Sequence, residues 1–542
     1  MAIVASMPYF IKEIGNTTQL RGYSGSMLLG AFAGSIAGGK LADQIGRKAL
    51  MTSSSVLFLV GSVFQTGGDN SAIMYCGRVL TGFCVGIYSM LVPLYQSEIA
   101  PKQLRGRLIT CYQYAITLGI FCASWISYGT KPIDNGSSWR IPMGVQVIPC
   151  LILLILIYFI PESPRYLMYR NHDSDALIVL SKLHGDGSSN HPDVYMEYVA
   201  MKQTITYEKT FKNYASYSRL FSGPPEDNRR RLLLGILTQI FQQLTGINPI
   251  LLFAPQALHA SGLNVRDTSL FADCIGTSIN MVATIPAIFF IDKFGRRSTM
   301  LVGASLLCIC LIIMSVLSIV AHFLYGGDYS SLDDRQDNFV FEGQTKREAI
   351  AFVCMEYIYV AVFAYTWGNL GWVYPSELYN QGVRAKALSI TNGFGWLLNF
   401  AVFEFYTPML SNTHGRSFIV FACCCATIVV VVYFYFPETK GKSLEEIDLI
   451  FGCDIGYYSV DAHHPQTAAA TLVHMEKIQR KNASKYPFQI GNCGPLYIRR
   501  EDESNPPPDT DDSTLHPTSV IIQHPSNLSN TSFSVSSSTS RL

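Results

Sequence analysis

Long stretches without a single Asp, Glu, Lys or Arg dominate this sequence. Eleven of them, each 17 to 34 residues long, cover residues 22–39, 49–68, 79–97, 108–130, 141–161, 232–265, 274–291, 298–327, 357–376, 387–403 and 417–437. About 20 apolar residues in a helix are enough to cross the hydrocarbon core of a bilayer, and the helix satisfies its own backbone hydrogen bonds there. The sequence therefore predicts an all-α integral membrane protein with eleven complete spans in a lipid bilayer.

The overall composition excludes several classes of soluble protein. Only 15% of the 542 residues are charged, against about 25% in a typical soluble domain. The 40 Lys and Arg residues nearly balance the 39 Asp and Glu residues, so no basic excess is present to bind a nucleic-acid backbone. We therefore expect neither an ordinary cytosolic enzyme nor a nucleic-acid-binding protein.

The sequence also argues against metal, nucleotide and cofactor sites. Most of the 14 cysteines lie inside the apolar stretches and no Cys-x-x-Cys pair occurs, which disfavours a metal site. Gly34 to Lys40 approximates a phosphate-binding loop, but Leu41 stands where such a loop requires Ser or Thr. No pair of carboxylates is spaced to flank a glycosidic bond in the predicted cavity. We expect no metal, no nucleotide, no cofactor and no enzymatic activity.

The basic residues predict the orientation of the spans. Eleven Lys and Arg residues fall in the 23 positions of four short turns, at 40–48, 102–107, 293–297 and 384–386. Only seven fall in the 60 positions of the alternate turns, at 67–74, 130–140, 259–268, 325–349 and 411–416. Basic loops face the cytoplasm. This orientation places the central hydrophilic segment and the C-terminal tail in the cytosol.

Three charged motifs occur twice and in the same order. An Asp-x-x-Gly-Arg-basic motif begins at Asp43 and again at Asp292. A Glu that precedes an Arg by seven residues, and a Pro-Glu-(Ser or Thr) triplet that closes an apolar stretch, also recur, and these motifs begin at Glu98, Glu377, Pro161 and Pro437. Ordered repetition on one side of the membrane indicates the two parallel-repeat halves of a secondary transporter, with its site between the halves.

The repeat divides the chain into four parts. Residues 1–160 are predicted to form the N-terminal transmembrane half, and residues 232–436 the C-terminal transmembrane half. Residues 161–231 form a cytosolic central loop, and residues 437–542 form a cytosolic tail. From about residue 499 the tail is rich in Ser, Thr, Pro, Asp and Asn, and a segment of that composition is predicted to be disordered.

The acidic residues of the repeated motifs need an explanation besides membrane orientation. Positive-inside anchoring accounts for some of the arginines, but acidic residues contribute little to orientation. We therefore expect interhelical ion pairs that close the cytoplasmic mouth in one conformation and separate in the other. The residues assigned to these pairs are Asp43, Arg47, Glu98, Arg105, Glu162, Asp292, Arg296, Glu377, Arg384 and Glu438.

Further motifs accompany the repeat. They are Arg78 to Gly86, PESPRYL from Pro161, QQLTGIN from Gln242, WGNLGWVYPSEL from Trp367 and PETKGKSLEEID from Pro437. Together, from about Tyr9 to Asp448, they resemble the sugar porter family of the major facilitator superfamily, and in particular its fungal monosaccharide transporters. The resemblance implies a twelve-helix major facilitator fold, a sugar substrate, and either facilitated diffusion or proton symport. Gly395 departs from the family, which commonly has Asn there.

A neutral monosaccharide offers hydroxyl groups that both donate and accept hydrogen bonds. Side-chain amides do the same, and a set of amides inside membrane spans indicates a hydrated cavity, with helix-to-helix hydrogen bonding as the alternative. Three aromatic residues offer flat faces to the C–H groups of a sugar, although tryptophans also belt the membrane interface. The predicted substrate-binding residues are Gln113, Gln242, Gln243, Asn248, Asn280, Phe363, Trp372, Trp396 and, by resemblance alone, Asn399.

The beginning of the chain is short against the family pattern. Family members open with a first helix bearing Gly-Tyr-Asp, whereas this sequence reaches Ser6-Met7-Pro8 almost at once. In proton-coupled relatives that Asp pairs with an Arg that matches Arg78, so the resemblance implies a role for Arg78 in proton coupling, with its acidic partner missing from this chain. An isolated charge in the membrane costs about 2.5–3.5 kcal/mol. We therefore expect a sequence truncated within the first helix, with an authentic short isoform as the alternative.

Three functions stay open on the sequence. The first is transport of a monosaccharide, a hexose in particular, by proton symport across a plasma membrane. The second is a transporter-like sugar sensor, which the 106 residues after position 436 would suit. The third is a passive facilitator, or a carrier of a disaccharide, polyol or quinate, in the same fold.

Overall fold

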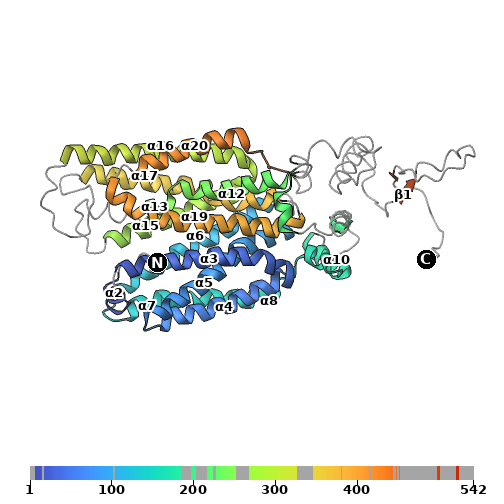
Figure 1. Ribbon diagram of the computed structural model, residues 1–542, viewed down its shortest axis with the longest axis horizontal. Coiled ribbons are helices and arrows are strands. Elements are labelled where there is room, and N and C mark those ends of the chain that lie inside the picture. Colours follow the sequence, from blue (N-terminus) through green and yellow to red (C-terminus); the bar gives the residue numbers. More distant parts are fainter. Residues whose placement is uncertain are drawn as a thin grey trace, which may run out of the picture.

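The computed structural model is almost wholly helical (Figure 1). It describes residues 7–14, 17–101, 104–184, 216–223, 227–251, 268–325, 346–379, 381–413 and 417–442, with a few residues of 194–205, residues 447 and 451, and two short strands. The helices run roughly side by side along the long axis and form two bundles, one drawn in blue and the other in green to orange. This arrangement agrees with the two halves expected from the repeated motifs.

The N-terminal bundle is built from seven helical segments. They are α2 (Pro8–Ile14), α3 (Thr17–Ile45), α4 (Arg47–Gly67), α5 (Ser71–Ile99), α6 (Arg105–Thr130), α7 (Ser137–Val145) and α8 (Val147–Phe159). The seven-residue α2 lies in the part of the chain where only a remnant of a first helix is expected. The fifth predicted span, 141–161, is divided into α7 and α8, and Pro142 lies within α7.

The C-terminal bundle contains the second set of spans. Its segments are α12 (Asn228–Leu244), α13 (Ile247–Leu251), α15 (Thr268–Phe294), α16 (Arg296–Tyr325), α17 (Lys346–Tyr365), α18 (Trp367–Leu378), the short 3-10 turn η3 (Gln381–Val383), α19 (Arg384–Thr413) and α20 (Ser417–Tyr435). Between the bundles in sequence lie α9 (Pro164–Tyr169), α10 (Asp173–His184) and η1 (Tyr217–Phe221). Part of the predicted span 232–265 lies outside the described residues.

Eight of the described helical segments are long and apolar enough to cross a membrane by length and composition. The other three predicted spans correspond to α3, to α12 with α13, and to α19, which are helical but more polar. Of these, α3 packs along α5 and α19, and α12 packs along α18 and α19. Helices that face other helices instead of lipid need fewer apolar residues, so their polarity is compatible with a central position.

Small residues let α3 approach α5 closely. A Cβ atom added at Gly34 of α3 would lie 1.9 Å from the carbonyl oxygen of Phe83 in α5. Gly34 belongs to a stripe with Gly30 and Gly38 on the same helix face. The stripe therefore serves backbone packing, as small residues commonly do in membrane bundles.

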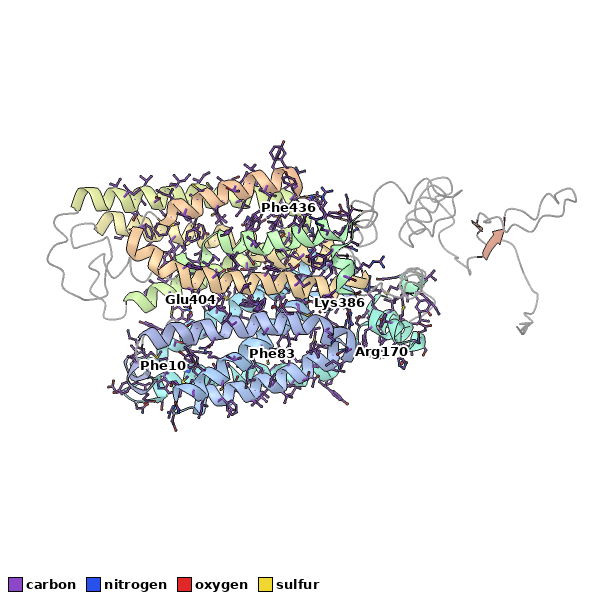
Figure 2. The ribbon with its side chains drawn as sticks, viewed as in Figure 1. Phe10, Phe83, Arg170, Lys386, Glu404 and Phe436 are labelled. Carbon is purple, nitrogen blue, oxygen red and sulfur yellow. The ribbon has the colours of Figure 1, made fainter. Side chains whose placement is uncertain are left out.

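The bundles are joined chiefly by α3 with α19 and α6 with α15, and also by α5 with α19 and α6 with α18. Ser35 of α3 donates a hydrogen bond to the carbonyl of Ser389 at 3.0 Å. Trp125 of α6 donates to the hydroxyl of Ser278 at 3.1 Å. In Figure 2, Lys386 lies at the end of the bundles nearest Arg170, while Glu404 lies toward the opposite end.

The cytoplasmic end carries a small separate cluster. Met168, Ala176 and Leu180 of α9 and α10 are buried against Val194 and Met201. Farther along the chain, strands β1 (Tyr497–Arg500) and β2 (Val520–Gln523) pair antiparallel near the start of the segment predicted to be disordered. The remainder of that segment lies outside the described residues, so its predicted disorder stays a prediction.

Candidate functional site

The first repeated motif forms a compact charged corner at the end of the N-terminal half that is predicted to face the cytoplasm. Arg47 pairs with Glu98 through two hydrogen bonds, from Nη2 at 2.8 Å and from Nε at 3.1 Å. Both side chains are at least 90% buried. Glu162 accepts hydrogen bonds from the backbone N–H groups of Arg47 and Lys48, each at 3.1 Å, and so caps the N-terminus of α4. Gly46, just before this helix, has a φ of 93°.

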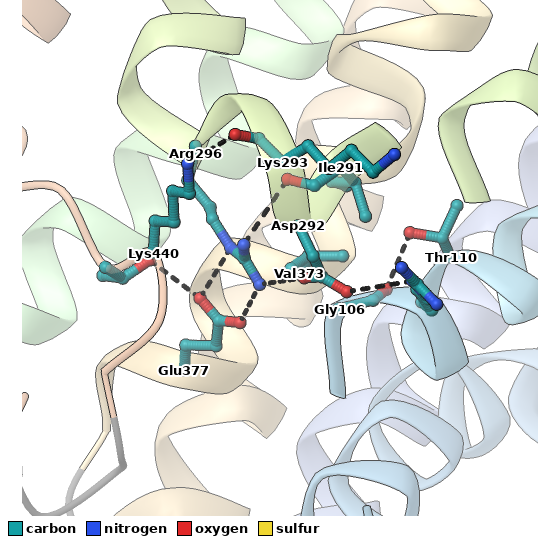
Figure 3. Close-up of polar contacts among 12 residues, drawn as sticks. Gly106, Thr110, Ile291, Asp292, Lys293, Arg296, Val373, Glu377 and Lys440 are labelled. Atoms are coloured by element: carbon teal, nitrogen blue, oxygen red, sulfur yellow. Dashed lines mark hydrogen bonds and ion pairs between the residues drawn. The ribbon is translucent and has the colours of Figure 1, made fainter. Parts of the chain in front are cut away.

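The second motif repeats this corner in the C-terminal half. Arg296 pairs with Glu377 at 2.7 and 3.2 Å and also contacts Asp292 at 2.9 Å. Glu438 accepts from the backbone N–H groups of Arg296 and Arg297 at 2.8 and 3.0 Å and caps α16. Figure 3 shows Glu377 and Asp292 on either side of the Arg296 guanidinium. The two halves therefore present matching constellations at one end of the molecule.

The corner ion pairs form within each half, whereas other pairs cross between the halves. Lys386 contacts Asp43 at 2.7 Å, and Arg107 lies 3.8 Å from Asp292. Because α6 begins close to α15, a Cβ at Gly106 would lie 2.1 Å from a carboxylate oxygen of Asp292. These contacts join the halves at their cytoplasmic ends.

Two arginines predicted to join ion pairs are placed differently. Arg384 donates through Nε and Nη2 to the backbone carbonyl of Tyr379, at 3.1 and 2.7 Å. Arg105 is buried at the start of α6. The ion pairs of Glu98 and Glu377 are those with Arg47 and Arg296 described above. Arg384 thus binds a backbone carbonyl just after α18.

A hydrogen bond between the halves lies among the predicted sugar-binding residues. Trp372 of α18 donates from Nε1 to Oε1 of Gln113 in α6 at 2.8 Å. The ring of Tyr112 meets the Trp372 indole edge-on, with centroids 5.4 Å apart. An indole held from the opposite half is well placed to stack against a sugar between the halves.

The amides of the C-terminal half form two groups. Gln242 donates from Nε2 to the carbonyls of Trp367 and Gly368 at 3.2 and 3.4 Å. Asn248 donates to Gln243 at 2.9 Å and to Asn399 at 3.2 Å, which joins α13, α12 and α19. The structure thus brings Asn399 beside two residues to which only the family pattern linked it.

Three other predicted binding residues differ in their surroundings. Asn280 of α15 is buried, and its Oδ1 has no hydrogen-bond partner among the described residues. Trp396 donates to the hydroxyl of Ser89 at 3.0 Å, again across the halves. Phe363 is buried in the main hydrophobic core of the bundle, so its contacts are those of a packing residue.

Two amides of this region were missed by the sequence analysis. Gln239 is buried and donates to the carbonyl of Gly371 at 2.7 Å and to Oδ1 of Asn392 at 3.0 Å. Asn392, also buried, donates to the backbone carbonyl of Ser89 at 2.9 Å. Both lie in uncharged stretches, and Gln239 precedes Gln242 by three residues on the same helix face. Like the other amides, these two side chains lie in membrane spans, and such residues indicate a hydrated cavity.

Arg78 lies within α5 and is buried. Its guanidinium lies over the ring of Tyr23 in α3, 4.4 Å from the ring centroid, and its Nη1 contacts the sulfur of Met27 at 3.3 Å. A cation over an aromatic face is stabilised by the ring electrons. The guanidinium is therefore not isolated as the sequence alone suggested, since α3 supplies an aromatic partner.

A family model described as "Sugar (and other) transporter" matches residues 5–451 of the chain. The chain belongs to the sugar porter family of the major facilitator superfamily. This sugar porter is 33% identical to the MFS glucose transporter mfs1 of Aspergillus flavus, over 79% of this chain and 80% of the relative. It is 31% identical to the high-affinity glucose transporter of Kluyveromyces lactis, over 82% and 80% of the two chains.

One further relative of this sugar porter is named as a sensor and not as a transporter. The high glucose sensor RGT2 of Saccharomyces cerevisiae is 32% identical over 83% of this chain, but the match covers only 57% of that protein. Transporters and a sensor therefore share this sequence pattern.

Comparison with solved structures shows that the sugar porter has the major facilitator fold of XylE. XylE, described as a proton:xylose symporter bound to 6-bromo-6-deoxy-D-glucose, aligns with a TM-score of 0.67 at 26% identity, over 80% of this chain and 89% of that one. The inward-open conformation of XylE from E. coli aligns with a TM-score of 0.55 at 27% identity over the same shares. The protein is thus a multi-pass membrane transporter of sugar and not an enzyme.

Proposed function

We propose that the chain transports a hexose of the glucose class across the plasma membrane by alternating access. The observation that carries this proposal is the hydrogen bond between Gln113 and Trp372, which places an amide and an indole from opposite halves together. Amides match sugar hydroxyls, and an indole matches the C–H face of the ring. The names of the fungal relatives support glucose as the substrate.

The charged contacts suit the two motions that alternating access requires. The Arg47–Glu98 and Arg296–Glu377 pairs hold neighbouring helix ends together inside a half, so each half moves as a body. The Lys386–Asp43 and Arg107–Asp292 contacts cross between halves and must separate when the cytoplasmic side opens. We propose that only the second group changes between the two conformations.

Proton coupling is the finer part of the proposal. The XylE likeness, to a protein named a proton:xylose symporter, supports it, and so does the buried guanidinium of Arg78 at a position that matches the family's coupling residue. The test is glucose uptake by proteoliposomes with and without an imposed proton gradient, acid outside. Symport predicts uptake above the equilibrium level that collapses with a protonophore. Uptake that stops at equilibrium, unchanged by the gradient, would make the chain a passive facilitator.

The second candidate function is a sugar sensor, which the 32% identity to RGT2 favours. The discriminating experiment is uptake of labelled glucose by cells that lack their own hexose transporters. Transport predicts uptake that saturates with glucose concentration. Glucose-dependent stabilisation of the purified protein without uptake would favour the sensor.

A further inference from the structure

The side-chain amide of Gln239 occupies the space beside Gly395, which has no side chain of its own. A Cβ atom added at Gly395 in α19 would lie 2.7 Å from Oε1 of Gln239. The amide of Gln239 therefore sits against the bare backbone of α19, where it donates to Asn392 one turn earlier at 3.0 Å. Any side chain at position 395 would displace it.

The amide pair continues into the other half. Asn392 accepts from Gln239 through Oδ1 and donates through Nδ2 to the carbonyl of Ser89 in α5, so both ends of its amide are bound and its orientation is determined. The Ser89 hydroxyl accepts from Trp396 at 3.0 Å and itself donates to the carbonyl of Gly86 at 2.7 Å. Ser89 and Asn392 are almost wholly buried. Two residues of α19 thus hold one residue of α5.

This contact lies on the cytoplasmic side of the sugar-site amides. From Ser89, α5 continues ten residues to its cytoplasmic end at Ile99, about 15 Å at the rise of a helix. Gln242 and Gln243 follow Gln239 toward the outer end of α12, and Asn399 follows Asn392 by two turns toward the outer end of α19. The contact between α5 and α19 therefore lies between these amides and the cytoplasmic ends of the two helices.

We propose that Asn392 is a positioning residue that holds the inner barrier shut. Its Oδ1 accepts a hydrogen bond from the Gln239 amide, and its Nδ2 donates one to the carbonyl of Ser89 in α5. We call this link between α19 and Ser89 the latch. The inference rests on the proposed function. The latch is neutral and buried, so salt does not screen it, unlike the ion pairs at the cytoplasmic surface. When the halves separate on the inner side, the bond to the Ser89 carbonyl breaks, and Gln239 retains Asn392 in the C-terminal half.

Two variants act on the latch without a change of side-chain size at the bond. Asn392→Leu keeps a side chain of similar size but removes both the Oδ1 acceptor for Gln239 and the Nδ2 donor to the Ser89 carbonyl. Gly395→Ala adds a Cβ against the flexible end of Gln239, so the amide shifts while the helix backbone stays. Ser62→Ala is the matched control, because Ser62 is also buried and, among the described residues, its hydroxyl bonds only the Phe58 carbonyl of its own helix.

The measurement is hydrogen–deuterium exchange of the purified full chain without sugar, followed by glucose transport. Loss of the latch raises the inward-open population by about tenfold, the equivalent of one buried hydrogen bond. We expect faster exchange at the cytoplasmic ends of α5 and α19 and slower exchange at the outer ends of α6 and α15 in both variants. The apparent KM for outside glucose should rise, by at most the same factor, and Ser62→Ala should match the wild type.

The opposite signs at the two ends separate the latch from simple loosening. Faster exchange at both ends of the molecule, or no change at either end, would overturn the proposal. The exchange pattern needs no sugar, so it tests the latch even if the wild-type chain proves not to transport glucose. If glucose is transported and the exchange is unchanged, the proposed function stands and the latch does not.

Discussion

Each amide of the candidate site has hydrogen-bonding capacity beyond its protein contacts. Among the described residues, the hydrogen bonds of the Gln242 side chain use Nε2 alone, and the Oδ1 of Asn280 has no partner. A side-chain amide has two donor hydrogens and an acceptor oxygen. The unused groups are the ones that sugar hydroxyls would satisfy.

Gln242→Ala tests this at the residue scale. Loss of a hydrogen bond to a buried hydroxyl costs about 1–3 kcal/mol, so we expect the apparent KM for glucose to rise about tenfold or more. The measurement is initial uptake in transporter-deficient cells, normalised to protein at the surface. Gln65→Ala is the control, because Gln65 is a buried amide that bonds Gly77 and Thr81 between α4 and α5. An unchanged KM in Gln242→Ala would assign that residue to helix packing.

Residue types were predictable from the sequence where the chemistry is local, but their partners were not. An amide in an apolar stretch is conspicuous, and Gln113, Gln242 and Asn248 could be found that way. The sequence could not show that Glu98 meets Arg47, because that contact depends on how α5 crosses the start of α4. Nor could it show that the space left at Gly395 is filled by Gln239, which lies on another helix.

Helix ends carry the motifs of this chain, and the two caps show why. A carboxylate at a helix N-terminus accepts from unpaired N–H groups and lies at the positive end of the helix dipole. Glu162 does this for α4 and Glu438 for α16. The φ of 93° at Gly46 and 88° at Gly295 is a conformation that other residues rarely adopt.

Glu162→Ala should therefore destabilise the N-terminal half. A lost cap costs about 0.5–2 kcal/mol, and we expect a lower Tm in detergent than the wild type. Asp134→Asn, at an exposed position in the loop between α6 and α7, is the control and should leave the Tm unchanged. Equal melting of Glu162→Ala and the wild type would mean that the cap contributes nothing to stability.

The docking of α10 on α5 is expected to depend on pH. His184 Nδ1 contacts the Glu197 carboxylate and Nε2 lies 3.0 Å from the carbonyl of Ile99, the last residue of α5. Both partners are acceptors, so both nitrogens donate only when the imidazole is protonated. The hydrogen bond to Glu197 raises the pKa of His184 above its ordinary 6.5.

The raised pKa of His184 determines the direction in which the docking of α10 on α5 changes with pH. Docking of α10 on α5 is fully stabilised below about pH 6.5 and weakens as the pH rises through the higher pKa of the folded state. We expect faster hydrogen–deuterium exchange in α10 at alkaline pH, after correction for the intrinsic rate. His184→Gln should abolish this trend, while His172→Gln, at an exposed position, should preserve it. A trend that survives in His184→Gln would point to another titrating group.

At the scale of the whole molecule, few charges join the halves. The Lys386–Asp43 pair is partly exposed, with side chains 11% and 31% accessible, and a pair of that kind contributes about 0.2–1 kcal/mol. Lys386→Asp should raise the apparent KM for outside glucose by about fivefold or less, because it favours the inward-open state. The swap Asp43→Lys with Lys386→Asp should recover most of this loss. A swap no better than the single variant would exclude this pair from the inner barrier.

The fold as a whole was accessible from the sequence because lipid imposes a simple rule on it. Apolar stretches predicted the spans, and the basic turns and repeated motifs predicted the two halves. The central helices α3, α12 and α19 were found by their lack of charge, although their composition is less apolar than that of the lipid-facing helices. The joint between the halves could not be read from any single stretch, since it is made by side chains from helices far apart in sequence.

The charged corner occurs twice in one polypeptide, with each arginine, carboxylate and cap supplied by its own half. Every substitution at Arg47 has a counterpart at Arg296, which forms a matching ion pair in the other half. A pair of such variants differs only in which half carries the lesion. The two variants can therefore be compared directly with each other. Any difference between their transport rates measures how unequally the two halves contribute to the transport cycle.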